Sequence, residues 1–319
     1  MATEQPLVTE LVPGFYQVAT DYPDVADAPE WLYLGTGAGS FMADAACAST
    51  WDATLKHAFA ELGMDASGLD WVLITHGHPD HTGAVNSLRR AGSRCQVAAS
   101  LTDARWIESF DRQWQEFWRA YPGVVDVEPA LADMRAMSGG DLRVDRVLRD
   151  GDRLEIGDWI IDVLETRAHT PGHTAYFERT SGVLMTGDLA LGRVIPTASG
   201  TSVFGPLYRD VDEQLAALHR LRELPFTWVC PAHFAAKPRD EGLALIDEAI
   251  AMIDENESVV MAAATAGRSV SLRDIAGALG EHWGMNPAVW VHSTYVADAH
   301  LRRAAREGRL EPRWGAPGS

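Results

Sequence analysis

Residues 71–81 of this 319-residue chain read Trp71-Val72-Leu73-Ile74-Thr75-His76-Gly77-His78-Pro79-Asp80-His81. The apolar run that opens this stretch predicts a buried strand, and three histidines and an aspartate follow directly after it. Imidazole and carboxylate groups are ligands that zinc and iron use in proteins, and a loop at the end of a strand can turn several of them toward one point. The stretch therefore predicts a metal site at the end of a buried strand.

Three more candidate ligands lie in short motifs further along the chain. They are His173 in Thr170-Pro171-Gly172-His173-Thr174, Asp188 in Thr186-Gly187-Asp188, and His233 in Cys230-Pro231-Ala232-His233. A lone pair of histidines would be weak evidence for a metal site, whereas this set offers enough ligands for two ions. His169 lies four residues before His173, and we expect it to hydrogen-bond a ligand rather than to bind metal.

The order of these motifs resembles the metallo-β-lactamase superfamily. The HxHxDH block comes first, and the PGHT, TGD and PAH motifs follow in that order. Residues Trp31–Asp44 are similar to the first hairpin of the family, which usually ends in an aspartate. The resemblance spans residues 8–240 and implies an α+β fold, a four-layer αββα sandwich in which two sheets each carry outer helices.

The resemblance also implies which side chains hold which ion. His76, His78 and His173 would hold metal 1, Asp80, His81 and His233 would hold metal 2, and Asp188 would bridge the two ions. Two divalent ions lower the pKa of a shared water, and the resulting hydroxide is the expected nucleophile. We expect Asp80 to orient this hydroxide and to relay a proton. Zn²⁺ is the expected metal, and the same ligands would also accept iron or manganese.

Composition limits the possible partners. The chain has 46% hydrophobic residues, enough for one large core and a small second domain, and its formal charge of −18 repels polyanions. We therefore expect a small-molecule substrate rather than a nucleic acid. The three scattered cysteines do not form a disulfide framework, and residues 1–10 lack the pattern of a signal peptide. No apolar run approaches the ~20 residues of a membrane span, so we expect a cytoplasmic protein.

Hydrophobic periodicity predicts the order of the elements. We expect strands at residues 16–19, 31–34, 71–75, 95–99, 144–148, 159–164, 176–177, 183–185 and 227–230, with a turn rich in Pro and Asp at 21–29. We expect helices at residues 50–62, 82–90, 211–223 and 241–265.

An aromatic helical insertion is expected at residues 101–138. Its aromatic residues recur at spacings of three and four, which places them on one helical stripe: Trp106, Phe110, Trp114, Phe117, Trp118 and Tyr121. This stripe packs against the domain or a homodimer partner, or else it forms a lid in which Trp114 and Trp118 cover an apolar acyl group. The loop Gly192–Tyr208 would form the opposite wall. Arg193 and Lys237 would neutralise a substrate carboxylate or phosphate, or else serve as ordinary surface residues.

The chain is expected to divide into a catalytic domain, residues 1–265, and a tail, residues 266–319. Gly267 ends the long helix, and the tail resembles the small winged-helix tail of some superfamily hydrolases. The tail holds seven arginines against five acidic residues. Binding to DNA is one alternative for it, but we expect its last helix to dock through arginines on the acidic catalytic domain.

Three function classes follow from these patterns. The leading class is a dinuclear metal hydrolase of an ester-like bond, with a thioester or lactone ahead of a phosphodiester because of the acidic charge. An iron-dependent oxidoreductase on the same fold and a regulator that binds DNA through the tail are the alternatives. A class B1 β-lactamase is disfavoured because that class has cysteine at a metal 2 position, and the flavodiiron branch because it typically has Glu where this chain has His78.

Overall fold

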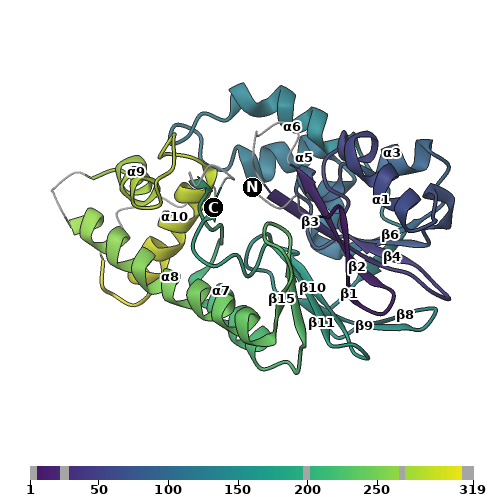
Figure 1. The fold of residues 1–319 in the computed structure, drawn as a ribbon. Coiled ribbons are helices and arrows are strands. Elements are labelled where there is room, and N and C mark those ends of the chain that lie inside the picture. Colours follow the sequence, from purple (N-terminus) through teal and green to yellow (C-terminus); the bar gives the residue numbers. More distant parts are fainter. Residues whose placement is uncertain (1–5, 22–28, 197–201, 266–269, 311–319) are drawn as a thin grey trace, which may run out of the picture.

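Two β-sheets pack face to face, and helices cover the outer face of each sheet (Figure 1). The computed structural model describes residues 6–21, 29–196, 202–265 and 270–310. The α+β fold and the αββα layering expected from the sequence are confirmed. The expected turn at residues 21–29 lies almost entirely outside the described residues, as does Gly267.

The first sheet has seven strands whose spatial order follows the chain. The strands from β1 to β4 pair antiparallel, and those from β4 to β7 pair parallel. The carboxyl ends of the parallel strands therefore meet at one edge, where ligand-bearing loops can converge. The strands are β1 (Val8–Val12), β2 (Phe15–Asp21), β3 (Pro29–Gly35), β4 (Phe41–Ala43), β5 (Trp71–Leu73), β6 (Gln96–Ser100) and β7 (Arg146–Leu148).

The second sheet has six strands in the order β15-β14-β11-β10-β9-β8. Only the pairing of β11 with β14 is parallel, so these two strands also end at one edge. The strands are β8 (Arg153–Ile156), β9 (Trp159–Glu165), β10 (Thr174–Glu178), β11 (Val183–Gly187), β14 (Trp228–Pro231) and β15 (Lys237–Pro238). Separate from both sheets, β12 (Ile195–Pro196) pairs with β13 (Ser202–Phe204).

Side-chain alternation explains why both faces of each sheet are buried. In β3, Tyr33 points into the core between the sheets, whereas Leu32 and Leu34 point into the core beneath the outer helices. The helices outside the first sheet are α1 (Lys56–Glu61), which continues a π-helical turn at Trp51–Leu55, and α3 (Val85–Arg90); a 3₁₀ turn follows α1 at Ala66–Gly68. Outside the second sheet lie α7 (Val211–Arg222) and α8 (Arg239–Thr265).

Two expected elements differ at their ends. The strand that leads to the ligand block ends at Leu73 rather than Thr75, because the Thr75 amide donates to Asp44 Oδ1 at 2.7 Å instead of to a neighbouring strand. The helix expected at 82–90 begins only at Val85, as α3, and Thr82 instead ends a separate short helix, α2 (Pro79–Thr82). Gly83 lies between the two helices, where a Cβ would come within 2.1 Å of the Met137 carbonyl oxygen. Close contact of two backbones therefore shapes this corner.

The insertion expected at 101–138 is helical. It contains α4 (Leu101–Ile107), α5 (Phe110–Gln113), a π-helical turn at Trp114–Trp118, a 3₁₀ turn at Glu128–Ala130 and α6 (Leu131–Ser138). All six aromatic residues of its stripe are buried and share one cluster with Val291 and Tyr295 of the last helix. Packing against the rest of the chain, one of the expected alternatives, is thus present.

The C-terminal helices, α9 (Leu272–His282) and α10 (Val291–Arg306), pack on α8. Residues 270–310 contain no strand, so the part of the tail that is described shows no wing. Arg306 pairs with Asp210 and Asp212 at the start of α7, and Arg303 also reaches Asp212. Docking through arginines is therefore confirmed, while the domain boundary at 265/266 stays a prediction. None of the described helices has the length and hydropathy of a membrane span.

Candidate metal centre

Loops at the ends of strands bring the candidate ligands together. The 76–81 block follows β5, Asp188 follows β11, and His233 follows β14, so strand ends from both sheets contribute. The loop between β9 and β10 carries His169 and His173. All of these side chains are buried.

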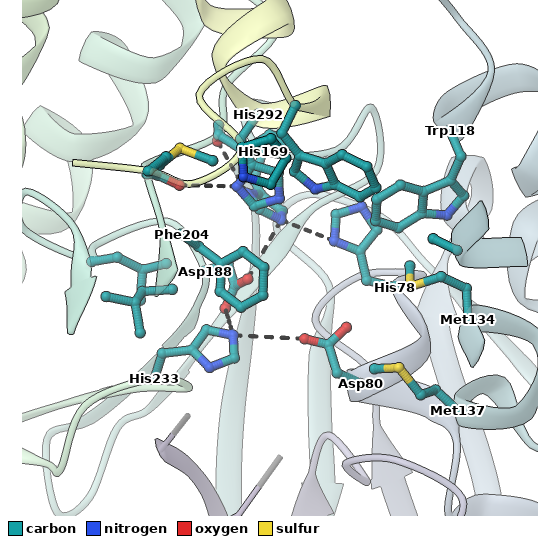
Figure 2. Close-up of a pocket in the computed structure, with 18 of the residues that line it drawn as sticks. His78, Asp80, Trp118, Met134, Met137, His169, Asp188, Phe204, His233 and His292 are labelled. Carbon is teal, nitrogen blue, oxygen red and sulfur yellow. Dashed lines mark hydrogen bonds and ion pairs between the residues drawn. The ribbon is translucent and has the colours of Figure 1, made fainter. Parts of the chain in front are cut away.

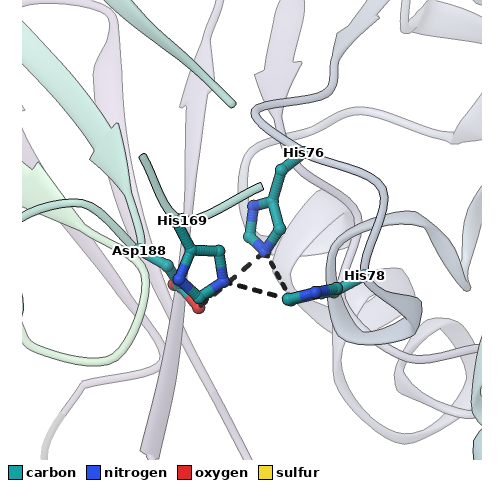
Figure 3. Close-up of side chains that lie close together, drawn as sticks. All are labelled: His76, His78, His169 and Asp188. Atoms are coloured by element: carbon teal, nitrogen blue, oxygen red, sulfur yellow. Dashed lines mark hydrogen bonds and ion pairs between the residues drawn. The ribbon is translucent and has the colours of Figure 1, made fainter. Parts of the chain in front are cut away.

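The first group consists of His76, His78, His169 and Asp188 (Figure 3). One nitrogen or oxygen atom from each lies within 4.8 Å of the others. His78 Nδ1 is 3.0 Å from His76 Nε2 and 3.1 Å from His169 Nε2. Three imidazole nitrogens and a carboxylate oxygen so close together match the donor set of a divalent cation.

The second group consists of Asp80, His81 and His233, which also offer ligand atoms within 4.8 Å of one another. Asp80 Oδ2 lies 3.3 Å from His81 Nε2 and 3.7 Å from His233 Nε2. His81 Nε2 is buried, and no described residue forms a hydrogen bond with it. A buried imidazole nitrogen without such a partner fits a metal ligand.

Asp188 lies between the two groups. Its Oδ2 faces the first, 3.9 Å from His76 Nε2 and 3.5 Å from His169 Nε2. Its Oδ1 faces the second, 3.6 Å from His81 Nε2 and 3.4 Å from His233 Nε2. One carboxylate can thus contact cations in both groups, which is the geometry required for the bridging role expected from the sequence.

His169 occupies the place that the sequence analysis gave to His173. The Leu207 carbonyl, 3.0 Å away, can only accept a hydrogen bond, so His169 Nδ1 carries the proton and Nε2 presents its lone pair to the group. His173 uses both nitrogens inside the protein: Nδ1 lies 2.6 Å from Thr166 Oγ1, and Nε2 accepts from the Asp188 amide at 3.3 Å. The geometry therefore groups His169, and not the expected His173, with His76, His78 and Asp188, while the His173 ring contacts the backbone of Asp188.

The histidines of the two groups differ in the direction of their pKa shifts. Burial lowers the pKa of His76 and His78 well below its usual range and that of His169 to about 4, so these rings are neutral and able to bind metal. Burial also acts to lower the pKa of His81 and His233, but nearby carboxylates, above all those of Asp80 and Asp188, outweigh it. The pKa of His233 rises to about 9. Protons on His81 and His233 therefore neutralise the negative charge of Asp80 and Asp188. A bound divalent cation would neutralise the same charge and replace these protons.

Two buried aspartates hold the ligand loops, and sequence reasoning gave neither a role. Asp44 Oδ2 lies 2.9 Å from His81 Nδ1 and accepts from Thr75 Oγ1 at 2.8 Å. Asp103 accepts from the amides of Gly77 and Gly172 at 2.9 and 2.8 Å and thereby ties the 76–81 loop to the 169–173 loop. The position of Asp44 at the end of the first hairpin was a signal for its role; Asp103, inside a helix, offered none.

A cavity of about 370 Å³ opens directly against both groups (Figure 2). His78, Asp80, His169, Asp188 and His233 reach its surface. Much of the remaining wall is apolar and comes from three separate parts of the chain. The insertion supplies Trp118, Met134 and Met137, and the loop after Asp188 supplies Leu191, Ile195, Phe204 and Leu207. Met285 and Trp290 come from the segment between the two C-terminal helices. The expected opposite wall at 192–208 is therefore present in its described part.

The four expected substrate-binding residues differ in position. Trp118 lines the cavity and packs against His78 at a ring distance of 5.2 Å. Trp114 does not line it but stacks on Phe110. Arg193 and Lys237 line a separate surface groove, where they pair with Glu255 and Glu241.

Comparison with known proteins agrees with this geometry. The sequence model of the Metallo-beta-lactamase superfamily matches residues 29–233. Hydroxyacylglutathione hydrolase from Acidiphilium cryptum (strain JF-5) is 28% identical over 49% of this chain and 47% of its own length. Hydroxyacylglutathione hydrolase GloC from Haemophilus influenzae is 25% identical over 45% of this chain and 65% of its own length. The chain thus spans about half to two thirds of the length of these relatives.

Solved structures share the fold over nearly the whole chain. A metallo-beta-lactamase family protein from Thermus thermophilus covers 97% of this chain and 98% of its own, with a TM-score of 0.75 and 24% identity. A beta-lactamase domain protein from Burkholderia ambifaria covers 95% of this chain and 89% of its own, with a TM-score of 0.70 and 22% identity. Because the family model covers most of the chain and the two ligand groups lie at the ends of its strands, the chain belongs to the metallo-beta-lactamase superfamily.

Proposed function

We propose that this chain is a divalent-metal-dependent hydrolase of an uncharged, ester-like substrate with an apolar acyl arm, either a thioester or a lactone. The observation that carries the proposal is the cavity beside the two ligand groups. Its wall is mainly apolar, and none of its described lining residues is Lys or Arg. An apolar arm gains about 0.8 kcal/mol for each buried methylene group, whereas the described lining offers no lysine or arginine to pair with the charge of a phosphodiester.

In this proposal His76, His78 and His169 hold one ion, Asp80, His81 and His233 hold the other, and Asp188 contacts both. Zn²⁺ is the proposed metal because the set combines imidazole with a few carboxylates. Bound divalent ions supply water activation near neutral pH and polarisation of the scissile carbonyl. The protein orients the reactants around them: Asp44 and Asp103 fix the ligand loops, and the apolar wall excludes bulk water from the reacting bond.

Asp80 is the proposed proton-transfer residue. Its carboxylate reaches the cavity surface and lies beside His81 and His233. Burial acts to raise the pKa of Asp80, but those two imidazoles outweigh it and hold the pKa well below its usual range, so the group is an anion at neutral pH. An anionic carboxylate oxygen at the cavity can orient a water molecule and accept its proton.

The curated relatives support the type of bond but not the whole substrate. By their name they act on hydroxyacylglutathione, which is a thioester. Glutathione carries two carboxylates, for which the described lining of this cavity offers no lysine or arginine. Met285 and Trp290 also lie beyond residues 29–233, so part of the wall comes from outside the segment that the family model matches.

A panel of zinc-loaded assays tests the proposal. We expect measurable kcat/KM on neutral medium-chain thioesters or lactones, a lower value on S-acylglutathione with the same acyl group, and none on phosphodiesters. Turnover confined to phosphodiesters, or to the glutathione thioester, would contradict the proposed substrate. The absence of hydrolysis across the whole panel in a metal-replete sample would contradict the proposed reaction.

A further inference from the structure

The cavity wall contains one polar side chain, that of His292, which belongs to neither ligand group and is not fully exposed. Besides the ligand groups, the polar residues of the described lining are Asp133, Asn286 and His292. Asp133 and Asn286 are exposed, whereas His292 is partly buried near the first residue of α10. In Figure 2 the imidazole of His292 lies near His169, on the side of the cavity opposite Asp80.

The contacts of His292 fix which nitrogen carries its proton. Its Nδ1 lies 2.9 Å from the carbonyl oxygen of Gly205, which can only accept, so Nδ1 is the donor. Burial lowers the pKa of His292, and the positive end of the α10 dipole likewise disfavours a second proton on the ring. Nε2 is therefore an unprotonated acceptor, and no described residue donates a hydrogen bond to it.

The ring is also held in place. Phe204 stacks on it with ring centroids 5.5 Å apart and an interplanar angle of 29°. Ser293 Oγ accepts from the Trp290 amide at 3.1 Å and fixes the start of the helix that carries His292. A fixed acceptor beside a largely apolar wall loses its hydrogen bond to water when an apolar ligand covers it, so it discriminates strongly between ligands that do and do not donate a hydrogen bond.

We propose that His292 is a specificity-determining residue that accepts, through Nε2, a hydrogen bond from a hydroxyl group on the acyl arm of the substrate. This inference rests on the proposed function, because it assumes that the apolar part of the cavity holds an acyl arm. It narrows the substrate class to neutral hydroxyacyl esters, thioesters or lactones. The specificity comes from the C-terminal helices, which lie beyond the residues matched by the family model.

Binding of ketones that cannot be hydrolysed tests His292 independently of turnover. Medium-chain methyl ketones with and without a hydroxyl β to the carbonyl are titrated into the zinc-loaded protein. The signal is the change in total tryptophan fluorescence, to which Trp118 and Trp290 contribute from the cavity wall. We expect wild type to bind the hydroxylated ketone about 10-fold more tightly, as for one well-made hydrogen bond. His292→Phe should bring this ratio to about one, and His292→Gln, which keeps an acceptor oxygen, should restore part of it.

The matched control is His57→Gln, an exposed histidine on α1, which should keep the wild-type ratio. A ratio near one in wild type, or an unchanged ratio in His292→Phe, would overturn the role of His292. Thioesters of the same two acyl arms, with and without the hydroxyl, give the corresponding ratio of kcat/KM. If the ketone ratio responds to His292 while no ester-like substrate is hydrolysed, the binding role stands and the proposed reaction fails.

Discussion

Single hydrogen bonds decide which histidine can bind metal. His169 and His173 lie four residues apart in one loop, and both are buried and neutral. The Leu207 carbonyl keeps the proton on Nδ1 of His169 and leaves Nε2 available, whereas Thr166 and the Asp188 amide occupy both nitrogens of His173. The spacing of the two histidines contains no information about these partners, which come from distant parts of the chain.

At the residue scale, Asp80→Asn should lower kcat at least ~100-fold in a metal-replete sample, because the amide cannot accept a proton from water. Metal content must be measured on the same sample, so that loss of an ion is not mistaken for loss of proton transfer. Asp158→Asn, at an exposed turn, is the matched control and should keep the wild-type kcat. Near wild-type turnover in Asp80→Asn would remove Asp80 from the mechanism.

Glu30 should make the stability of the metal-free protein depend on pH. Burial, with a smaller effect of the Asp80 carboxylate, raises the pKa of Glu30 from 4.5 to about 8. The folded state then binds this proton more tightly than the unfolded state. The resulting stability is fully present below pH 4.5 and is lost as the pH rises through 8.

Urea unfolding of the metal-free protein between pH 4.5 and 8 measures this effect. The free energy of unfolding of wild type should fall relative to that of Glu30→Gln by about 1.4 kcal/mol for each unit of pKa shift. Parallel pH profiles for the two proteins would show that Glu30 is already ionised in the folded state.

At the scale of elements, α4 connects the two ligand loops through Asp103. Asp103→Asn keeps the size of the side chain but replaces one acceptor oxygen with a donor that faces the amides of Gly77 or Gly172. We expect the metal dissociation constant to rise by about 10- to 100-fold, the usual effect of losing support behind a ligand. Competition with a chelator provides the measurement, and Asp111→Asn on the exposed face of α5 should leave the constant unchanged.

The aromatic insertion should separate substrate selection from packing. Trp118→Ala should flatten the rise of kcat/KM with acyl chain length, because Trp118 lines the cavity. Trp114→Ala should retain that rise but lower the free energy of unfolding by about 3–5 kcal/mol, because Trp114 is buried against Phe110. Equal effects of the two substitutions on the chain-length series would contradict this division of roles.

Local patterns predicted most of the elements, and long-range contacts account for the differences. Alternating and apolar runs located the strands that carry His76, Asp188 and His233, because burial on both faces of a sheet requires them. The end of β5 and the corner at Gly83 depend on Asp44 and on α6, which contact these sites from elsewhere in the sequence. The roles of Asp103, His169 and His292 likewise depend on partners that only the folded chain brings near.

Across the whole molecule, the cavity depends on the docking of the C-terminal helices. Tyr295 of α10 stacks on Phe117 at a ring distance of 4.9 Å, and Phe117 in turn packs on His78 at 4.7 Å. Tyr121 donates to Asp298 at 2.8 Å across the same interface. These contacts join the last helix, the insertion and the first ligand group, which explains how the tail can supply part of the cavity wall.

Metal stoichiometry tests the account most directly. Elemental analysis of purified, zinc-loaded wild type should find about two ions per chain, as the two ligand groups require. His169→Ala should lose close to one ion, and His219→Ala, an exposed histidine on α7, should lose none. Wild type without stoichiometric metal, or His169→Ala with its full complement, would contradict the assignment of these residues as a dinuclear metal centre.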